Sequence, residues 1–341
     1  MSEKDTNRRD YLSIVKVVAC FLVLWDHVNG SWFTFRMGKT WILSTIIHVL
    51  VNCAVPLFAM TTGALLLDYR DKYSTKEFFN RRLHTVVLPF LFWSIIYMIK
   101  AMRNGKFVFS ISGAVNGILN YSFISIFWYF ISLFGAYLSM PIFSAISKDK
   151  RQGVYKYCIL GYLVINLTIP FLFKILDLKY NTDIQIVSLN GFLLFVIAGY
   201  YIDHYEITRK IRLLIYFAGT ACAAYNIIDC LLRSFQNNEI TRTFSGYASL
   251  TYMITGLALF TFFRYMGPKV HRFLFAITKP FFSLTFGIFL IQILVLDGIK
   301  KLQFIDIHSW IYISFAVIPV FAICAFCCYI IKKIPGLRQL I

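Results

Sequence analysis

The chain is a succession of long apolar segments separated by short polar ones. No polar stretch exceeds about twenty residues, so a separate soluble domain has no room. The pattern predicts an all-α polytopic membrane protein, a bundle of about ten transmembrane helices forming one domain over 1–341 with a short tail at 1–11. The ten segments, each of about 18 residues or more, are 12–31, 41–67, 84–101, 120–143, 155–175, 186–203, 213–232, 246–263, 281–299 and 310–331.

Composition supports this interpretation. Hydrophobic residues make up 59% of the 341 residues, charged residues 15%, and the mean hydropathy is +0.68. Most of the chain is therefore expected in lipid. The first segment has no small-residue cleavage signal before Lys39, which favours an uncleaved first span. All eight cysteines fall inside predicted spans, where they act as small apolar residues, and we expect no metal site and no bound cofactor.

The net charge of +18 could indicate either nucleic-acid binding or membrane topology. If the N-terminus is cytoplasmic, the cytoplasmic segments contain 22 of the 34 Lys and Arg residues and the outer segments contain 11, with Lys16 inside the first span. This distribution satisfies the positive-inside rule. We therefore expect cytoplasmic N- and C-termini, contacts with membrane lipids and no nucleic-acid partner.

Two ionisable residues, Lys16 and His27, lie eleven positions apart inside the first segment. Eleven residues advance a helix by about three turns and about 16 Å, so both side chains point the same way from different depths. Each alone has a simple explanation: Lys16 could snorkel to the headgroups and His27 could sit in water at the outer interface. Together, with Cys20 and Val23 between them, they indicate a functional stripe that another helix or a thin ligand could occupy.

Further polar residues accompany this stripe. Asp26 is adjacent to His27 but about 100° around the helix, so it is a candidate participant that need not orient the imidazole. Two polar sets on later segments could line a polar cavity: His48 with Asn52 at i, i+4 spacing, and Asn226 with Asp229 and Arg233. Asp229 with Arg233 is more simply an ion pair within its helix.

Six short motifs follow one another along nearly the whole chain: DYLSIVKVVACFLVLWDHV, VPLFAMTTGALLL, FFNRRLHTVVLPFLFWS, FWYFISLFGAYLSMPI, IAGYYI and SLTFGIFLIQILVL. In order and spacing they resemble acyltransferase family three, the ten-span O-acyltransferases of bacterial surface polysaccharides, and most of all its enterobacterial-common-antigen O-acetyltransferase-like members. Lys16, Thr62 and Gln292 depart from the arginine, serine and late histidine of that pattern. Lysine keeps the positive charge of arginine but lacks its planar guanidinium group, and glutamine, unlike histidine, cannot exchange a proton.

The resemblance implies a multi-pass O-acyltransferase of a bacterial inner or plasma membrane. It would transfer an acyl group, chiefly acetyl, from cytoplasmic acetyl-CoA, a co-substrate, to a hydroxyl of a cell-surface polysaccharide or lipid-linked glycan. His27 would be the catalytic base or a transient acyl carrier. The pantetheine arm of coenzyme A, on the order of 15 to 20 Å long, matches three helical turns. Donor or substrate binding would involve Lys16, Arg81, Arg82, Asp26, Thr62, Trp128, Tyr129 and Gln292.

Simpler roles and rival functions stay open at this point. Arg81 and Arg82 could be topology anchors, and Trp128 and Tyr129 could be packing aromatics. A transporter or export partner is the first rival, although matching broken helices in two halves are not evident. An inactive family member is the second rival, because Gln292 replaces the late histidine. The sequence does not name the acceptor sugar.

Overall fold

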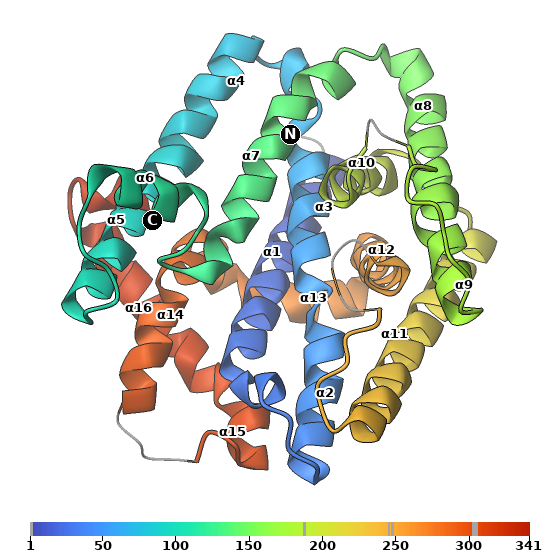
Figure 1. Ribbon diagram of the computed structural model, residues 1–341. Helices are drawn as coiled ribbons and strands as arrows, with labels where there is room; N and C mark the ends of the chain where they lie inside the picture. Colours follow the sequence, from blue (N-terminus) through green and yellow to red (C-terminus); the bar gives the residue numbers. More distant parts are fainter. Residues whose placement is uncertain (1–2, 187–188, 245, 247–248, 302–305) are drawn as a thin grey trace. The chain divides into compact units, whose positions relative to one another are not determined.

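The computed structural model describes residues 3–186, 189–244, 246, 249–301 and 306–341. Every regular element in these ranges is helical, and no strand occurs among them (Figure 1). The all-α prediction is therefore confirmed. The chain divides into two compact units, residues 1–65 with 148–326 and residues 66–147 with 327–341, and each is described by itself. The single domain predicted over 1–341 stays a prediction.

The first unit contains the first helices and most of the second half of the chain. Its elements are α1 (Glu3–Val28), η1 (Gly30–Phe33), α2 (Lys39–Val51), α3 (Ala54–Leu66), α8 (Lys148–Gly161), η5 (Tyr162–Thr168), α9 (Ile169–Ile175), α10 (Gly191–His204), α11 (Arg209–Asn237), α12 (Leu250–Tyr265), α13 (Pro268–Thr278), η6 (Lys279–Phe281), α14 (Thr285–Lys301), α15 (Trp310–Phe315) and most of α16 (Val317–Lys333).

The second unit contains the helices between α3 and α8 and the C-terminal end of the chain. Its elements are η2 (Tyr69–Asp71), α4 (Thr75–Arg82), η3 (Leu83–Val87), α5 (Leu88–Arg103), α6 (Ile111–Leu119), η4 (Ser125–Phe127), α7 (Trp128–Ser144), the end of α16 and η7 (Leu337–Leu340).

Six of the ten predicted spans coincide with helical runs long and apolar enough to cross a membrane. The other four fall mainly on α10, α12, α14 and α16, which have 14 to 17 residues. Helices α13 and α14 meet at a bend of 65°, and the count is seven if this pair is one span. The count of ten and the side on which the termini lie stay predictions. The six runs are Asp10–Val28, Lys39–Asp71, Thr75–Arg103, Ser125–Ser144, Lys148–Ile175 and Arg209–Asn237.

Two of these runs contain a wide π turn directly before a proline. The π segment η3 ends one residue before Leu88-Pro89, and η5 ends one residue before Ile169-Pro170. Proline has no N–H, and its ring collides with the carbonyl four residues earlier in a regular α-helix. A wider turn moves that carbonyl away, so the helix continues through the proline.

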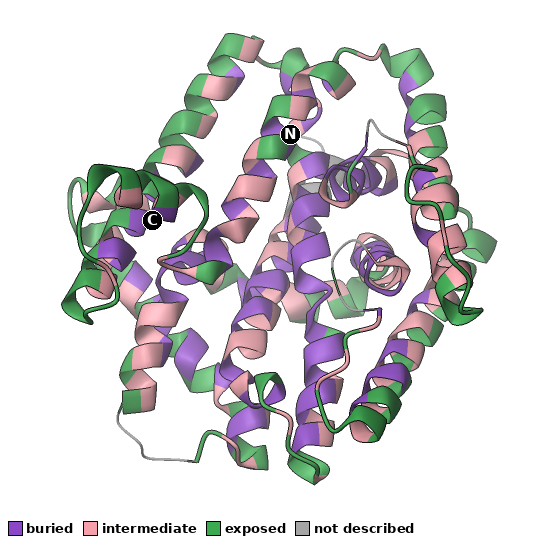
Figure 2. Cartoon of the chain, in the orientation of Figure 1, coloured by how far each residue is buried: buried purple, intermediate pink, exposed green. Residues whose placement is uncertain are grey.

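Helices α3 and α10 of the first unit cross with their backbones in contact. A Cβ atom on Gly63 would lie 1.8 Å from the carbonyl oxygen of Val196, and one on Gly199 would lie 2.0 Å from that of Met60. Only glycine fits such an approach. Figure 2 shows both helices as almost entirely buried. The glycines of the VPLFAMTTGALLL and IAGYYI motifs are thus two sides of one contact.

Helix α11 shows the opposite pattern, because its outer face is apolar and exposed (Figure 2). Leu213, Leu214 and Phe217 are 56%, 65% and 75% exposed. Contiguous exposed apolar surface of this kind is typical of a helix that faces lipid. The long apolar helices and this surface together describe a multi-pass membrane protein.

Candidate functional site

His27 lies in the last turn of α1, half-buried, against a glutamine of α14. Its Nδ1 atom is 3.4 Å from Oε1 of Gln292, whose side chain is almost fully buried. The Gln292 amide nitrogen donates to the carbonyl oxygen of Phe289 at 3.2 Å, which turns the amide oxygen toward the imidazole. That oxygen can accept a hydrogen bond only from a protonated Nδ1, so the Nε2 atom of His27 keeps its lone pair.

Asp26 contacts a different histidine. Its Oδ1 atom accepts a hydrogen bond from Nδ1 of His48 at 2.6 Å, which agrees with the expectation that Asp26 need not orient His27. Asn52 donates to Nε2 of His48 at 3.0 Å and to its carbonyl oxygen at 2.7 Å. Both ring nitrogens of His48 therefore have partners, and His48 holds Asp26 in place instead of offering a free base.

The His48 imidazole also stacks on Trp32 of η1. The two ring centroids are 3.4 Å apart with an angle of 15° between the planes, and Trp32 is buried. The guanidinium carbon of Arg242 lies 4.4 Å from the centroid of the Trp32 ring, a cation–π distance, and 5.7 Å from that of Phe33. Trp32 and Arg242 were not among the predicted site residues, because no sequence pattern connects positions 32 and 242.

Asp229 and Arg233 form the ion pair within α11 that their i, i+4 spacing predicts. Nε of Arg233 donates to Oδ1 of Asp229 at 2.7 Å. The carboxylate of Asp229 is therefore neutralised within its own helix.

Lys16 is half-buried in α1 and has no hydrogen bond or ion pair with any residue in the described part of the chain. Between Lys16 and His27, Cys20 and Val23 are buried. The Cys20 thiol donates to the carbonyl oxygen of Thr285 on α14 at 3.4 Å. Helix α14 therefore packs against the stripe at Cys20.

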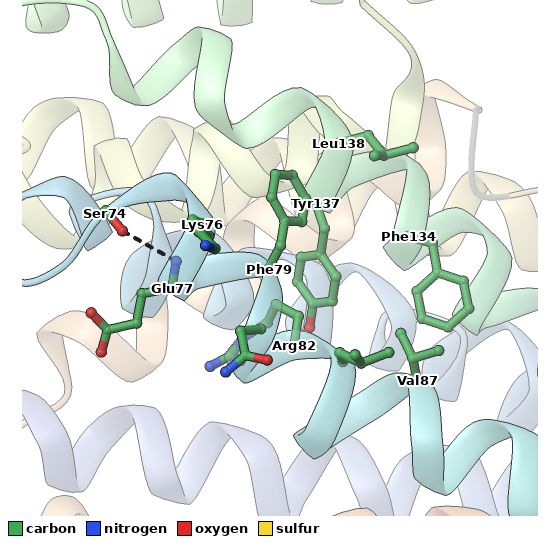
Figure 3. A pocket seen from close by; sticks show the side chains of 11 residues that line it. Ser74, Lys76, Glu77, Phe79, Arg82, Val87, Phe134, Tyr137 and Leu138 are labelled. Carbon is green, nitrogen blue, oxygen red and sulfur yellow. Dashed lines mark hydrogen bonds between the residues drawn. The ribbon is translucent and has the colours of Figure 1, made fainter.

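A cavity of about 810 Å³ lies in the second unit between α4, η3 and α7 (Figure 3). One part of its wall is polar and cationic and the other is apolar and aromatic. Figure 3 shows the Tyr137 hydroxyl directed toward the polar part. The lining residues are Ser74, Lys76, Glu77, Phe79, Asn80, Arg82, Leu83, Val87, Phe134, Tyr137 and Leu138.

The two arginines singled out from the sequence have different surroundings here. Arg81 is exposed and pairs with Glu77, with its Nη2 and Nε atoms 2.7 and 3.1 Å from Oε1. Arg82 lines the cavity together with Tyr137, and its Nε atom is buried without a hydrogen-bond partner in the described ranges. Arg82 is therefore the better placed of the two to bind an anion.

Three other predicted residues have local contacts. The Thr62 hydroxyl donates to the carbonyl oxygen of Phe58 within α3 at 2.9 Å. Trp128 and Tyr129 are half-buried at the start of α7, with ring centroids 6.4 Å apart. Neither of them lines the Arg82 cavity. Their predicted part in substrate binding stays a prediction.

A buried polar cluster in the first unit was missed by the sequence analysis. Arg151, which was counted only as a topology charge, is buried, and its Nη1 atom donates to the Tyr200 hydroxyl at 3.0 Å. Close by on α10, Asp203 accepts a hydrogen bond from the Tyr11 hydroxyl and lies 3.4 Å from the His204 imidazole. A buried guanidinium requires such partners, and the only sequence signal was a cation near the start of an apolar segment.

The comparisons with known proteins agree with the helical membrane architecture. The profile of a protein family described as "Acyltransferase domain" matches residues 9–331, nearly the whole chain. No curated protein and no solved structure shows a significant match. The enterobacterial-common-antigen O-acetyltransferase-like subgroup is thus not distinguished within that family. With 323 residues matched from α1 to the end of α16, the chain belongs to acyltransferase family 3.

Proposed function

We propose that this acyltransferase transfers acetyl from acetyl-CoA to a hydroxyl of a cell-surface polysaccharide or of a lipid-linked glycan. The observation that carries the proposal is the contact between His27 and the buried amide oxygen of Gln292, which leaves the Nε2 atom of His27 as a base. Acyl transfer to a hydroxyl requires such a base, because a neutral hydroxyl is a poor nucleophile.

The reaction follows from this arrangement. Nε2 of His27 takes the proton of the acceptor hydroxyl while the hydroxyl oxygen forms a bond to the thioester carbonyl carbon. The carbon–sulfur bond then breaks, and the departing thiolate takes the proton from the imidazolium. The products are an acyl ester on the sugar and free coenzyme A. If His27 carries the acyl group instead, the same bonds break in two steps.

Gln292 acts in this proposal as a positioning residue for His27. Its amide oxygen replaces the imidazole that the family pattern has at this place, and an amide can accept the Nδ1 hydrogen although it cannot exchange a proton. The departure from the pattern is thus compatible with activity, which argues against an inactive family member.

The donor phosphates are the proposed ligands of the cationic residues Lys16, Arg81 and Arg82. Lys16 has no acidic partner in the described part of α1 and its neighbours. Arg82 lines a cavity, and its buried Nε atom has no hydrogen-bond partner among the described residues. Arg81 already forms an ion pair with Glu77, so we expect it to contribute less than Arg82 to phosphate binding.

The location and topology belong to the same proposal. The protein would span a bacterial inner or plasma membrane ten times, with cytoplasmic termini and with acetyl-CoA entering from the cytoplasm. The excess of Lys and Arg on one side supports this topology.

The experiment uses the full-length protein in lipid nanodiscs with acetyl-CoA labelled on the acetyl group and glycans isolated from its host. We expect label in the glycan with the wild-type chain and with His84→Ala, an exposed histidine of η3. We expect none with His27→Ala. Equal labelling by His27→Ala and wild type at equal protein levels would remove the catalytic assignment, and glycan flux without donor would favour a transporter.

A further inference from the structure

The short helix η1 (Gly30–Phe33) begins three residues after His27 and therefore follows it directly at this end of α1. Two cations flank it. A Cβ atom placed on Gly30 would be 3.8 Å from Nζ of Lys300, and Arg242 lies over the rings of Trp32 and Phe33. Gly30 and Trp32 are two residues apart, so both charges border the same four-residue segment.

Neither cation has a carboxylate partner. No ion pair joins Lys300 or Arg242 to any residue whose side chain is described. Residues 245, 247–248 and 302–305, which lie outside the described ranges, include no Asp or Glu.

Three carboxylates of the surrounding elements are bonded to other groups. Asp26 accepts from His48 at 2.6 Å, and Asp229 accepts from Arg233 at 2.7 Å. Asp306 accepts from the backbone N–H of His308 at 2.9 Å. Asp26, Asp229 and Asp306 are therefore engaged, and neither Lys300 nor Arg242 forms an ion pair with a described side chain, so the two cations can attract an anion.

The same place has further groups suited to a sugar. The Ser31 hydroxyl is 2.9 Å from Nδ1 of His308, and Phe33 is 52% exposed. Ser31 is buried and its hydroxyl donates to the carbonyl oxygen of Ile307 at 3.0 Å, so it holds His308 beside η1. The His308 imidazole and the exposed Phe33 ring beside two cations give polar groups and an aromatic surface, as ligand sites usually do.

We propose that η1, Lys300 and Arg242 form the acceptor-binding site and that the acceptor carries a negative charge, a phosphate or a carboxylate, close to the hydroxyl that is acylated. This inference rests on the proposed function and narrows its acceptor to an acidic glycan. Lys300 and Arg242 hold the anionic group, and this places the neighbouring hydroxyl at Nε2 of His27.

The test measures binding of three small probes to the full-length protein in nanodiscs of zwitterionic lipid: glucose 1-phosphate, glucuronic acid and glucose. We expect at least one anionic probe to bind about tenfold more tightly than glucose, and the difference to shrink at high salt because exposed charges are screened. The ratio of the two anionic probes tells phosphate from carboxylate.

Lys300→Gln and Arg242→Gln should each weaken binding of the preferred anion about fivefold or more. Lys301→Gln removes the same charge from the next, exposed residue and is the matched control, with no expected effect. Equal binding of glucose and both anions, or equal effects of the Lys300 and Lys301 variants, would overturn the inference.

The donor assay separates the two proposals. Acetyl transfer to neutral and acidic glycans with equal efficiency would contradict the inference of an acidic acceptor and leave the acyltransferase proposal intact. Anion binding that depends on Lys300, without transfer to any glycan, would support the anion site and contradict the proposed reaction.

Discussion

The surroundings of His27 in the first unit and the Arg82 cavity in the second unit differ in how their polar groups are paired. In the first unit, Asp26, His48 and Asn52 satisfy one another, and Gln292 is fixed against His27. In the second unit, Arg82 lines a cavity of about 810 Å³, and its buried Nε atom has no hydrogen-bond partner among the described residues. A satisfied network holds groups in fixed geometry, as chemistry requires. An open cavity with cationic groups is suited to a ligand that binds reversibly.

The largest expected effect is on the fixed network. His27→Ala should reduce acetyl transfer by about 10² to 10⁴-fold, because general-base catalysis contributes this much. The measurement is the initial rate of label transfer at saturating acetyl-CoA. A decrease of less than tenfold would show that His27 is not the general base and would remove this contrast.

The packing of the two units can be compared through two glycines. Gly199→Ala places a methyl group against the backbone of Met60 and should lower the free energy of unfolding by about 3 kcal/mol or abolish folding. Gly135→Ala on α7 meets nothing within 4 Å and should be neutral or stabilising by about 0.5 kcal/mol. Thermal unfolding in detergent measures both, and similar melting temperatures would contradict the close approach of α3 and α10.

The cavity of the second unit is tested by its two neighbouring arginines. Arg82→Gln should raise KM for acetyl-CoA about tenfold with little change in kcat, since a charge-assisted contact is worth roughly 1.5 kcal/mol. Arg81→Gln should change KM less than about twofold, because an exposed pair contributes little. If the two variants raise KM equally, the cavity is not the donor site.

The smallest effect separates positioning from packing in the first unit. Gln292→Leu should lower kcat about fivefold, because one hydrogen bond that orients His27 is lost. Gln292→His restores a ring nitrogen at that place and should recover most of the rate. A purely structural role predicts instead that both variants lose stability and activity together.

The helices were predictable to the extent that they are long and apolar. The segments 12–31 and 213–232 match long helical runs because a continuous apolar stretch specifies a membrane helix. The short length of α10, 14 residues, depends on packing. The bend between α13 and α14 coincides with Pro280 in the connecting turn. Hydropathy predicts neither feature.

The site was predictable residue by residue but not as contacts. His27 and Gln292 were both singled out, yet 265 residues separate them and no spacing rule joins them. Arg81 and Arg82 are equivalent in the sequence. They differ only because Glu77 lies one turn before Arg81 on the exposed face of α4, while Arg82 faces α7.

The wide turn η3 begins directly after Arg82, and its residue count has a consequence for this cavity. A helix rotates by about 100° for each residue gained or lost. Deleting one residue between Leu83 and Val87 would therefore turn α4 relative to α5 and move Arg82 out of the cavity wall. The length of this five-residue turn therefore sets the direction in which Arg82 points, and substitutions that keep the length of the turn would leave that direction unchanged.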